Sequence, residues 1–525
     1  MIIRDNELGR IGVNTIPIPE DIRVLTAHYS FTGKIILLYR TGKEANEDYY
    51  HIALINDDGD GFKKIFSGEI KVSKKSNGIR ILPFTDNRRI LLGDYVLECF
   101  PDIDNCQYSK LLPLEYPWFI TRDPRTFKYY SEPIISPDGK HIAWTTLRIQ
   151  GAINFLGVLK RKKNKYKIEN IQVISDLESF DKEKEDERYI IPRKIRGGEV
   201  KQFIDGGKAI SLAGFDAWVQ DLETGKIIKI TNTPWYDETV IFSPDEKLGM
   251  VMTTRGSPKT SCSIFALLPR PYLLLAISPI IFHIYMYSIV GVRTIRKGNI
   301  GPAIIEIEKS MKDKNYMGVL LNDPKEEWVY ISPMSWHPSG KRALFLEMLR
   351  GEIDKKGRPL KVRLIRVDLY DYIPSNLVLP SQTPNNIPYA IKGIKMVWKV
   401  LTYRNKRMEG KIRGRYSGYI NYSNKMSFRL NIIEFRYNNF SDDGKNFYNG
   451  YEKTVFSPSD ETVYEADLKL VGEENGEMRL KVTFSKLFGE EPVRIIFDKD
   501  INGNPKSYGY VKYKDVILKV EDLLP

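Results

Sequence analysis

EPIISPDGKHIAWTT, residues 132–146, is the stretch that decides the fold. Apolar runs containing Ile and Trp, which favour strands, lie on both sides of a Ser-Pro-Asp-Gly-Lys turn. In this turn proline presets φ, aspartate bonds its own backbone and glycine accepts the positive φ that follows. Residues 132–146 therefore predict a β-hairpin.

The same phrase recurs along the chain. TVIFSPDEK (239–247) precedes LGMVMTT, and SWHPSGK (335–341) precedes RALFLEML. Weaker copies, each with an apolar run after a tight turn, lie around Gly33, Asp86 and Gly206. A second hairpin phrase follows some copies, as in WVQDLETGK (218–226) before IIKITNTP. Two hairpins make a four-stranded antiparallel unit of roughly 40 to 50 residues, the size of a propeller blade.

These phrases resemble the TolB-type (WD40-like) β-propeller repeat, in which SPDGK follows an extended run and a Thr-Gly turn leads to an ITNTP-like ending. The resemblance covers residues 20–380 and implies a propeller of six blades. It implies no activity, because such propellers serve as scaffolds, binding proteins and hydrolase lids. The six turns lie near Gly33, Asp86, Asp138, Asp205, Asp245 and Ser339. Wide gaps after Asp138 and after Asp245 leave room for a seventh blade.

Past residue 380 the repeat fades. Residues 381–394 are rich in Pro and Asn and predict a connector. From residue 395 the chain alternates like antiparallel strands, as in KMSFRLNIIEFRY and MRLKVTFSKL. We therefore predict an all-β protein, with a six-bladed (or seven-bladed) TolB-like propeller over residues 1–380 and an antiparallel β-sandwich or barrel domain over residues 395–525. An apolar insertion at about 256–300 interrupts the propeller.

The core of that insertion, Pro271–Val292, contains no Asp, Glu, Lys or Arg and is flanked by Arg270 and Arg293. Its length suits a transmembrane helix, but propeller-like sequence on both sides argues against a crossing. Three interpretations stay open. The segment packs under or beside the propeller, or it rests as an apolar patch on an anionic membrane surface or a partner protein, or it forms a lid over a cavity for a lipophilic ligand.

Composition narrows the functional classes. The 525 residues are 42% hydrophobic, which suits a large folded core, and the formal net charge of +13 permits an anionic partner without requiring one. Basic runs such as residues 159–167 lie beside acidic ones, so nucleic-acid binding is not expected. Three cysteines and a charged N-terminal stretch favour a reduced, cytoplasmic protein.

Motifs of known catalytic families are missing from the sequence. It contains no G-x-S-x-G elbow of the hydrolase type, no Walker A loop and no dinucleotide fingerprint, so we expect no cofactor. Its five histidines are scattered without ligand spacing, so no metal site is predicted either.

Candidate site residues follow from propeller geometry. The innermost strand of each blade begins near the axis, so residues just before each repeat phrase face the channel mouth. We predict an acid–base cluster of Glu132, Glu199 and Asp237, with Tyr130 beside it, because neighbouring carboxylates raise one another's pKa. Predicted ligand-binding residues are His28, Glu238, His283 and His337.

Two functions remain open on the sequence alone. One is a small-molecule enzyme or ligand-binding protein, with a pocket at the channel mouth or the domain junction and general acid–base chemistry on a lipophilic substrate. The alternative is a non-catalytic scaffold or protein-interaction module. An apolar pocket that holds carboxylates or histidines would favour the first, and a filled channel with a flat apolar patch would favour the second.

Overall fold

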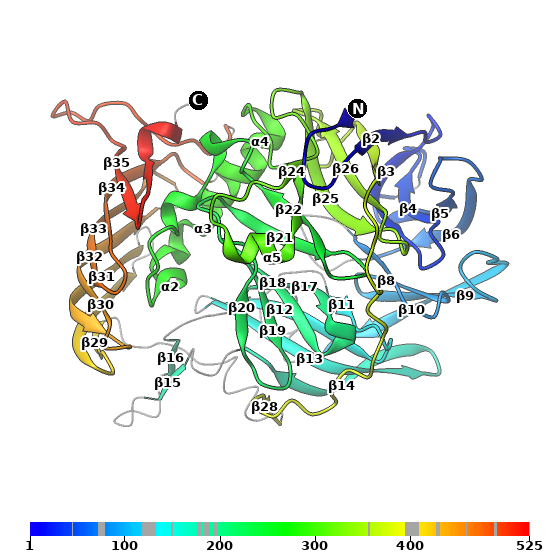
Figure 1. The fold of residues 1–525 in the computed structure, drawn as a ribbon, viewed down its shortest axis with the longest axis horizontal. Coiled ribbons are helices and arrows are strands. Elements are labelled where there is room, and N and C mark those ends of the chain that lie inside the picture. Colours follow the sequence, from blue (N-terminus) through cyan, green and yellow to red (C-terminus); the bar gives the residue numbers. More distant parts are fainter. Residues whose placement is uncertain are drawn as a thin grey trace.

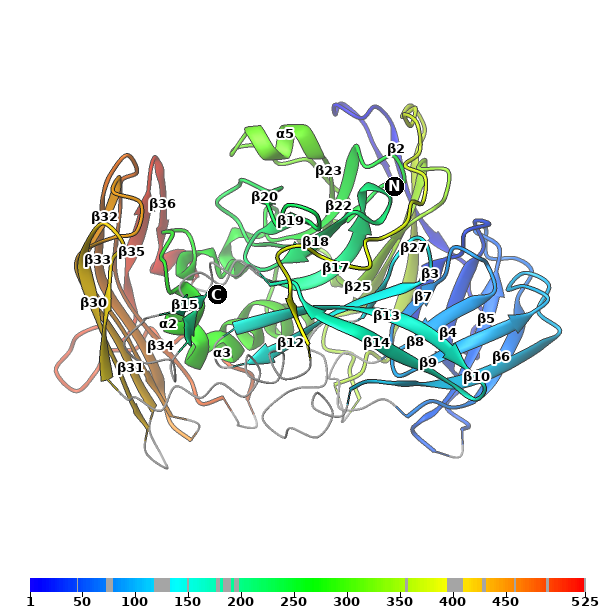
Figure 2. The ribbon, with the colours of Figure 1, turned by 90° about the horizontal axis from the view of Figure 1, so that it is seen from below.

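The computed structural model describes residues 1–44, 46–71, 79–117, 133–148, 151–175, 180–182, 190–192, 198–354, 357–393, 409–426, 431–457, 459–487 and 491–523. Within these residues, five antiparallel blades of four strands and a closing blade of five strands form a ring, and a separate eight-stranded sheet stands beside the ring (Figures 1 and 2). The protein is therefore all-β, with a six-bladed propeller followed by a second β domain.

Each of the first five blades is a meander of consecutive strands. Blade one has β3 (Arg23–Tyr29), β4 (Ile35–Arg40), β5 (Tyr49–Ile55) and β6 (Lys63–Glu69), and blade two has β7 (Ile81–Pro83), β8 (Arg89–Leu92), β9 (Tyr95–Phe100) and β10 (Tyr108–Glu115). Blade three has β11 (Ile134–Ile135), β12 (His141–Arg148), β13 (Gly151–Lys162) and β14 (Lys165–Val173). Blade four has β17 (Glu199–Ile204), β18 (Ala209–Ala213), β19 (Ala217–Asp221) and β20 (Ile227–Lys229), and blade five has β21 (Asp237–Phe242), β22 (Leu248–Thr253), β23 (Pro302–Glu306) and β24 (Val319–Leu320).

The sixth blade closes the ring with strands from both ends of the propeller. It joins β25 (Trp328–Trp336), β26 (Arg342–Leu349) and β27 (Val362–Leu369) to the N-terminal strands β2 (Ile11–Ile16) and β1 (Ile2–Ile3). In the β2–β27 pair, Ile11 lies opposite Leu369 and Ile16 opposite Leu364. The first strands of neighbouring blades contact one another, and β25 contacts β3 across the closure.

Neither wide gap holds a seventh blade in the described residues. The gap after Asp138 is occupied by the long strands of blade three and by a short pair, β15 (Phe180–Lys182) and β16 (Ile190–Pro192). The gap after Asp245 holds the apolar insertion and α5 (Ile307–Lys312).

The repeat turns occupy equivalent places, each between the first and second strands of a blade. The amides of Gly139, Glu246 and Gly340 close these turns on the carbonyls three residues earlier, at 2.8 to 2.9 Å. All three residues have positive φ, at +66°, +56° and +69°. Glu246 therefore adopts a conformation that glycine takes at low cost in the other two turns.

The connector after β27 runs along the propeller to β28 (Ile391–Lys392), which pairs with β14; it is the yellow segment of Figure 1. Asp245 Oδ2 accepts the Tyr372 hydroxyl at 2.7 Å and the Ser375 amide at 2.9 Å. Asp138 Oδ2 accepts the Thr383 amide at 3.1 Å. The repeat aspartates thus close their own turns with one oxygen and hold the connector with the other.

The C-terminal domain is one antiparallel meander. Its strands are β29 (Glu409–Arg413), β30 (Ser417–Met426), β31 (Asn431–Ser441), β32 (Asn446–Phe456), β33 (Thr462–Gly472), β34 (Gly476–Phe484), β35 (Tyr508–Tyr513) and β36 (Val516–Lys519). The short helix η7 (Val520–Leu523) follows. A second, antiparallel β domain is confirmed, but in the described residues it is a single sheet covered by helices of the insertion, and not the predicted sandwich or barrel.

That helical layer is the apolar insertion, which contains η3 (Pro258–Thr260), η4 (Ser263–Phe265), α2 (Leu273–Ile277), η5 (Ser278–Ile280), α3 (Ile281–Tyr285), η6 (Met286–Val290) and α4 (Gly291–Thr294). Phe265, Ile277 and Ile280 share one buried core with Phe435, Tyr464 and Leu480 of the sheet. Further along, Ile289 and Val292 pack with blades five and six. The insertion therefore fills the space between the two domains. No helix in the described part of the chain has the length and apolar character needed to cross a bilayer.

Candidate functional site

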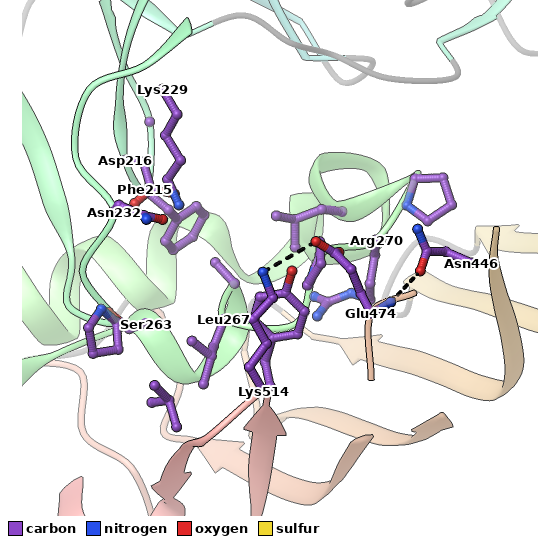
Figure 3. Close-up of a pocket in the computed structure, with 18 of the residues that line it drawn as sticks. Phe215, Asp216, Lys229, Asn232, Ser263, Leu267, Arg270, Asn446, Glu474 and Lys514 are labelled. Atoms are coloured by element: carbon purple, nitrogen blue, oxygen red, sulfur yellow. Dashed lines mark hydrogen bonds and ion pairs between the residues drawn. The ribbon is translucent and has the colours of Figure 1, made fainter. Parts of the chain in front are cut away.

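A cavity of about 660 Å³ lies where the propeller, the insertion and the C-terminal sheet meet (Figure 3). Its three walls come from blade four, from residues 263–273 of the insertion and from the β31–β32, β33–β34 and β35–β36 turns of the C-terminal sheet. Among the described residues, seven aromatic side chains line the cavity. They are Phe215, Trp218, Trp235, Tyr272, Phe440, Tyr448 and Tyr513. A concave, mostly apolar site with a few placed polar groups is the usual form of a small-molecule site.

The propeller wall carries a titratable pair. Asp216, in the turn between β18 and β19, forms an ion pair at 2.9 Å with Lys229, the last residue of β20. The Asp216 side chain is only 20% exposed. Burial raises the pKa of Asp216 from 3.8 to about 6, although the charge on Lys229 acts in the opposite direction. A carboxyl group with such a pKa can both take up and release a proton near neutral pH.

The insertion wall rests on a fully buried ion pair. Arg270 Nε lies 3.0 Å from Glu452 Oε2 on β32, and the Arg270 guanidinium also donates to the carbonyl of Phe265 at 2.7 Å. The hydroxyls of Tyr437 and Tyr464 donate to the two Glu452 oxygens at 2.6 and 2.9 Å. Because each charge is compensated, this network fixes the insertion against the sheet and positions the pocket wall.

The sheet wall carries the other charged groups (Figure 3). Lys514 Nζ lies 3.4 Å from Glu474 Oε1, and the Glu474 amide donates to Asn446 Oδ1 at 2.8 Å. Asp443 accepts the backbone amides of Lys445 and Asn446 at 2.9 and 2.8 Å, in the turn that joins β31 to β32. These hydrogen bonds help to lower the pKa of Asp443 to about 2 against the opposing effect of burial, so it is ionised at neutral pH.

Lys201, in β17, brings together two of the predicted site residues, Glu199 and Glu238. Lys201 contacts Glu199 and lies 3.9 Å from Glu238, and all three side chains are at most 20% exposed. The Tyr236 hydroxyl donates to Glu238 Oε2 at 2.8 Å. Burial, and more weakly the charge on Glu199, raises the pKa of Glu238, while Lys201 opposes the rise. The cluster is thus a carboxylate pair bridged by a lysine.

Asp237 lies elsewhere. Its carboxylate pairs with Arg255 at 2.8 Å, with both side chains fully buried, and it accepts the hydroxyls of Thr233 and Thr253 at 2.8 and 2.6 Å. With its oxygens engaged in this way, Asp237 joins β21 to the end of β22. This geometry suits a structural group, and it separates Asp237 from the cluster at Glu238.

The other predicted residues are dispersed. Tyr130 and Glu132 lie outside the described residues. His28, on β3, contacts the carbonyl of Tyr29 through Nδ1 at 2.7 Å, and burial lowers its pKa to about 4. His337 lies in the β25–β26 turn with Nδ1 2.8 Å from Ser339 Oγ, and His283 is buried against Phe456 and Phe484. These histidines form no common site, and no group of three His, Cys, Asp or Glu in the described chain is arranged to hold a metal ion.

Asp216, Lys229 and the aromatic rings of the junction were not predicted as site residues. Asp216 and Lys229 lie in blade four, outside the SPDGK-like turn phrase from which the site was predicted, and the C-terminal wall comes from residues more than two hundred positions after Asp216. The sequence offered only one weak signal, the density of aromatic residues at Phe215, Trp218 and Trp235 around the blade's last two strands.

Solved structures similar to this chain include several propeller-type proteins. TolB from Acinetobacter baumannii is 14% identical, with 64% of each chain covered and a TM-score of 0.29. An oligogalacturonate lyase from Vibrio parahaemolyticus is 10% identical over 70% of this chain and 98% of that chain, with a TM-score of 0.33. Prolyl oligopeptidase B from Galerina marginata is 8% identical over 79% of this chain and 47% of that chain, with a TM-score of 0.31.

The match thus spans slightly less than two thirds of the TolB chain and under half of the prolyl oligopeptidase chain. No protein-family model matches this sequence, and no curated protein is significantly similar to it. The activities in the three names belong to those proteins, and the propeller assignment rests on the strand pairing of the six blades.

Proposed function

We propose that this protein binds a small, largely apolar molecule in the junction pocket, on a propeller of the TolB type. One observation carries the proposal: a cavity of about 660 Å³, partly open to solvent, has walls from three separate segments and is lined by aromatic rings. Burial of apolar ligand surface against such rings supplies binding energy, while the few charged groups orient the ligand.

Binding of a neutral lipophilic dye, N-phenyl-1-naphthylamine, tests this proposal. The wild-type protein should enhance the dye's fluorescence in a saturable, one-site manner. Ala266→Trp places a large ring in the pocket lining and should abolish the enhancement. Ile295→Trp is the matched control, because Ile295 is exposed on the insertion and does not line the pocket. Non-saturable enhancement, or equal enhancement by both variants, would reject the pocket as a binding site.

A second candidate function, acid–base catalysis on the bound molecule, is favoured by Asp216. Its pKa of about 6 and its contact with Lys229 give the pocket a group that exchanges protons near neutral pH. For any compound that the protein converts, Asp216→Asn should retain binding and lose turnover. Unchanged turnover in Asp216→Asn would remove Asp216 from the chemistry and leave the binding role standing.

A further inference from the structure

The pocket lining has an acidic balance that the whole chain does not share. The chain has 80 Lys and Arg against 67 Asp and Glu. In the described pocket lining the order is reversed, with five carboxylates against Lys229, Arg270, Lys314 and Lys514. The lining thus carries one more carboxylate than basic groups, whereas the chain as a whole carries more basic groups.

Each basic group of the lining already contacts an acid. Lys229 pairs with Asp216, Lys514 with Glu474 and Lys314 with Asp515, and Arg270 is compensated by the buried Glu452. An anionic ligand would therefore have to break an existing ion pair to gain a cation. That exchange costs about as much electrostatic energy as it returns.

Asp443 is different, because its partners in the described residues are neutral. It accepts the amides of Lys445 and Asn446, the side-chain amide of Asn446 and the hydroxyl of Ser441. The Lys445 ammonium lies instead 2.8 Å from Glu473. Asp443 thus places on the pocket lining an ionised carboxylate that forms no ion pair within the described residues, although the Lys445 ammonium interacts with it at longer range.

The carboxylates of the sheet wall also act on the neighbouring phenol groups of Tyr448 and Tyr513. Burial raises the pKa of the Tyr448 phenol, and the charges of Glu474 and Asp443 raise it further. The Tyr513 phenol is affected in the same way by burial and by Glu474. Carboxylates that disfavour a phenolate next to them favour a cation in the same place.

The pocket's rings also accept cations in the structure itself. Lys514 Nζ lies 5.0 Å from the centre of the Tyr513 ring, and Lys229 Nζ lies 5.9 Å from the centre of the Trp218 ring. Both distances are within the range of cation–π attraction, which is the usual way in which proteins recognise quaternary and alkylated amines. The ring faces that line the pocket therefore suit a positively charged nitrogen.

We infer that the ligand of the junction pocket is an organic cation, an apolar or aromatic body that carries a positively charged nitrogen, with the nitrogen lying between Asp443 and the Tyr448 ring. This inference rests on the proposed binding function and adds the chemical class of the ligand. The aromatic lining holds the apolar body, and the carboxylates of the sheet wall select its charge.

A pair of probes that differ only in charge tests the inference. They are 2-(1-naphthyl)ethyl-trimethylammonium and its neutral isostere, in which a tert-butyl group replaces the trimethylammonium group; naphthylpropionate is the anion for comparison. Titration calorimetry on the full-length protein should give at least tenfold tighter binding of the cation than of the isostere, with the anion weakest. The preference should shrink as salt is raised.

Asp443→Asn should weaken binding of the cation three- to tenfold and leave the isostere unaffected. Asp500→Asn is the matched control, because Asp500 accepts backbone amides in a similar exposed turn away from the pocket. Equal affinity for the cation and the isostere, or tightest binding of the anion, would overturn the inference while the binding function stands. If none of the three probes binds, the proposed function itself fails.

Discussion

Asp237 and Arg255 are joined at 2.8 Å with neither side chain exposed to solvent. The adjacent residue, Glu238, faces Lys201 and Tyr236. A β-bulge separates their environments, because the pairing of β21 with β22 shifts between Asp237 and Thr239 and leaves Glu238 outside the ladder. Asp237 and Glu238, two consecutive acidic residues at the start of β21, thus have unrelated roles.

Arg255→Met should therefore destabilise the fold severely. The substitution leaves the Asp237 carboxylate buried without its cation, which costs about 3–5 kcal/mol. Urea unfolding at pH 7 measures the loss. The double variant Asp237→Asn/Arg255→Met removes the orphaned charge and should recover more than half of it. A double variant no more stable than Arg255→Met would show that the buried charge is not the cause.

Asp216→Asn should make the protein more stable at neutral pH, with an advantage that depends on pH. The pKa of Asp216 is raised from 3.8 to about 6 by burial, so the folded protein retains a proton that the unfolded chain loses between these values. Ionisation of the native carboxyl group therefore lowers stability as the pH rises from about 4 to about 6. The variant should gain about 1–3 kcal/mol above pH 6 and nearly nothing from this effect below pH 4.

Unfolding free energies of the wild type and Asp216→Asn from pH 3.5 to 8 test this dependence. Lys229→Met is the informative companion, because loss of the ammonium should raise the pKa of Asp216 further and extend the window to higher pH. A stability difference that stays constant across the range would contradict the burial effect.

The hairpins could be predicted from sequence because their causes are local. The turns at Asp138, Asp245 and Ser339 are specified by residues within five positions of one another, and the structure places them equivalently. The antiparallel C-terminal domain was predictable for the same reason, since its strands alternate with period two. Ring closure by β2 and the packing of the insertion on the C-terminal sheet are long-range pairings that no local pattern specifies.

The site was harder to predict than the fold. The first strands of blades four and five, β17 and β21, shift their pairing at Lys201 and Glu238, and a bulge changes the direction of the side chains around it. Position just before the repeat phrase grouped Asp237 with Glu199, whereas the structure joins Glu238 to Glu199 through Lys201. The junction pocket depends on three segments distant in sequence, so its lining could be found only in the folded chain.

Tyr372→Phe should loosen the connector. The substitution removes the hydroxyl that donates to Asp245 Oδ2 at 2.7 Å and should cost about 1 kcal/mol. Tyr370→Phe is the matched control, because Tyr370 is 52% exposed two residues earlier. Hydrogen exchange of the Ser375 amide should accelerate in Tyr372→Phe alone. Equal exchange rates in the two variants would show that the connector is held without this contact.

Lys201→Met should destabilise the protein in a pH-dependent way. Lys201 lowers the pKa of Glu238 against burial and Glu199, so its removal raises that pKa further. Above this pKa the two carboxylates repel each other without the intervening ammonium, and we expect a loss of about 1–2 kcal/mol at pH 8. At pH 4 protonation should remove most of the loss. Denaturant unfolding of the wild type and Lys201→Met at pH 8 and at pH 4 measures the two losses of stability. A larger loss at pH 4 than at pH 8 would contradict the stabilising effect assigned to Lys201 on the ionised carboxylates.

Two substitutions, at positions two residues apart, test whether the insertion is part of the hydrophobic core of the C-terminal domain or only lies against its surface. Ile280 is fully buried in the core shared with the C-terminal sheet, and Phe282 is 45% exposed. Ile280→Asp buries an unpaired carboxylate among Phe and Leu side chains, which costs several kcal/mol, whereas Phe282→Asp can hydrate its charge. Proton NMR of the C-terminal residues should show loss of the dispersed sheet signals in Ile280→Asp and their retention in Phe282→Asp. If Ile280→Asp keeps these signals and the wild-type melting temperature, the insertion is not part of that core, and the sheet folds without the packing of Ile280 against it.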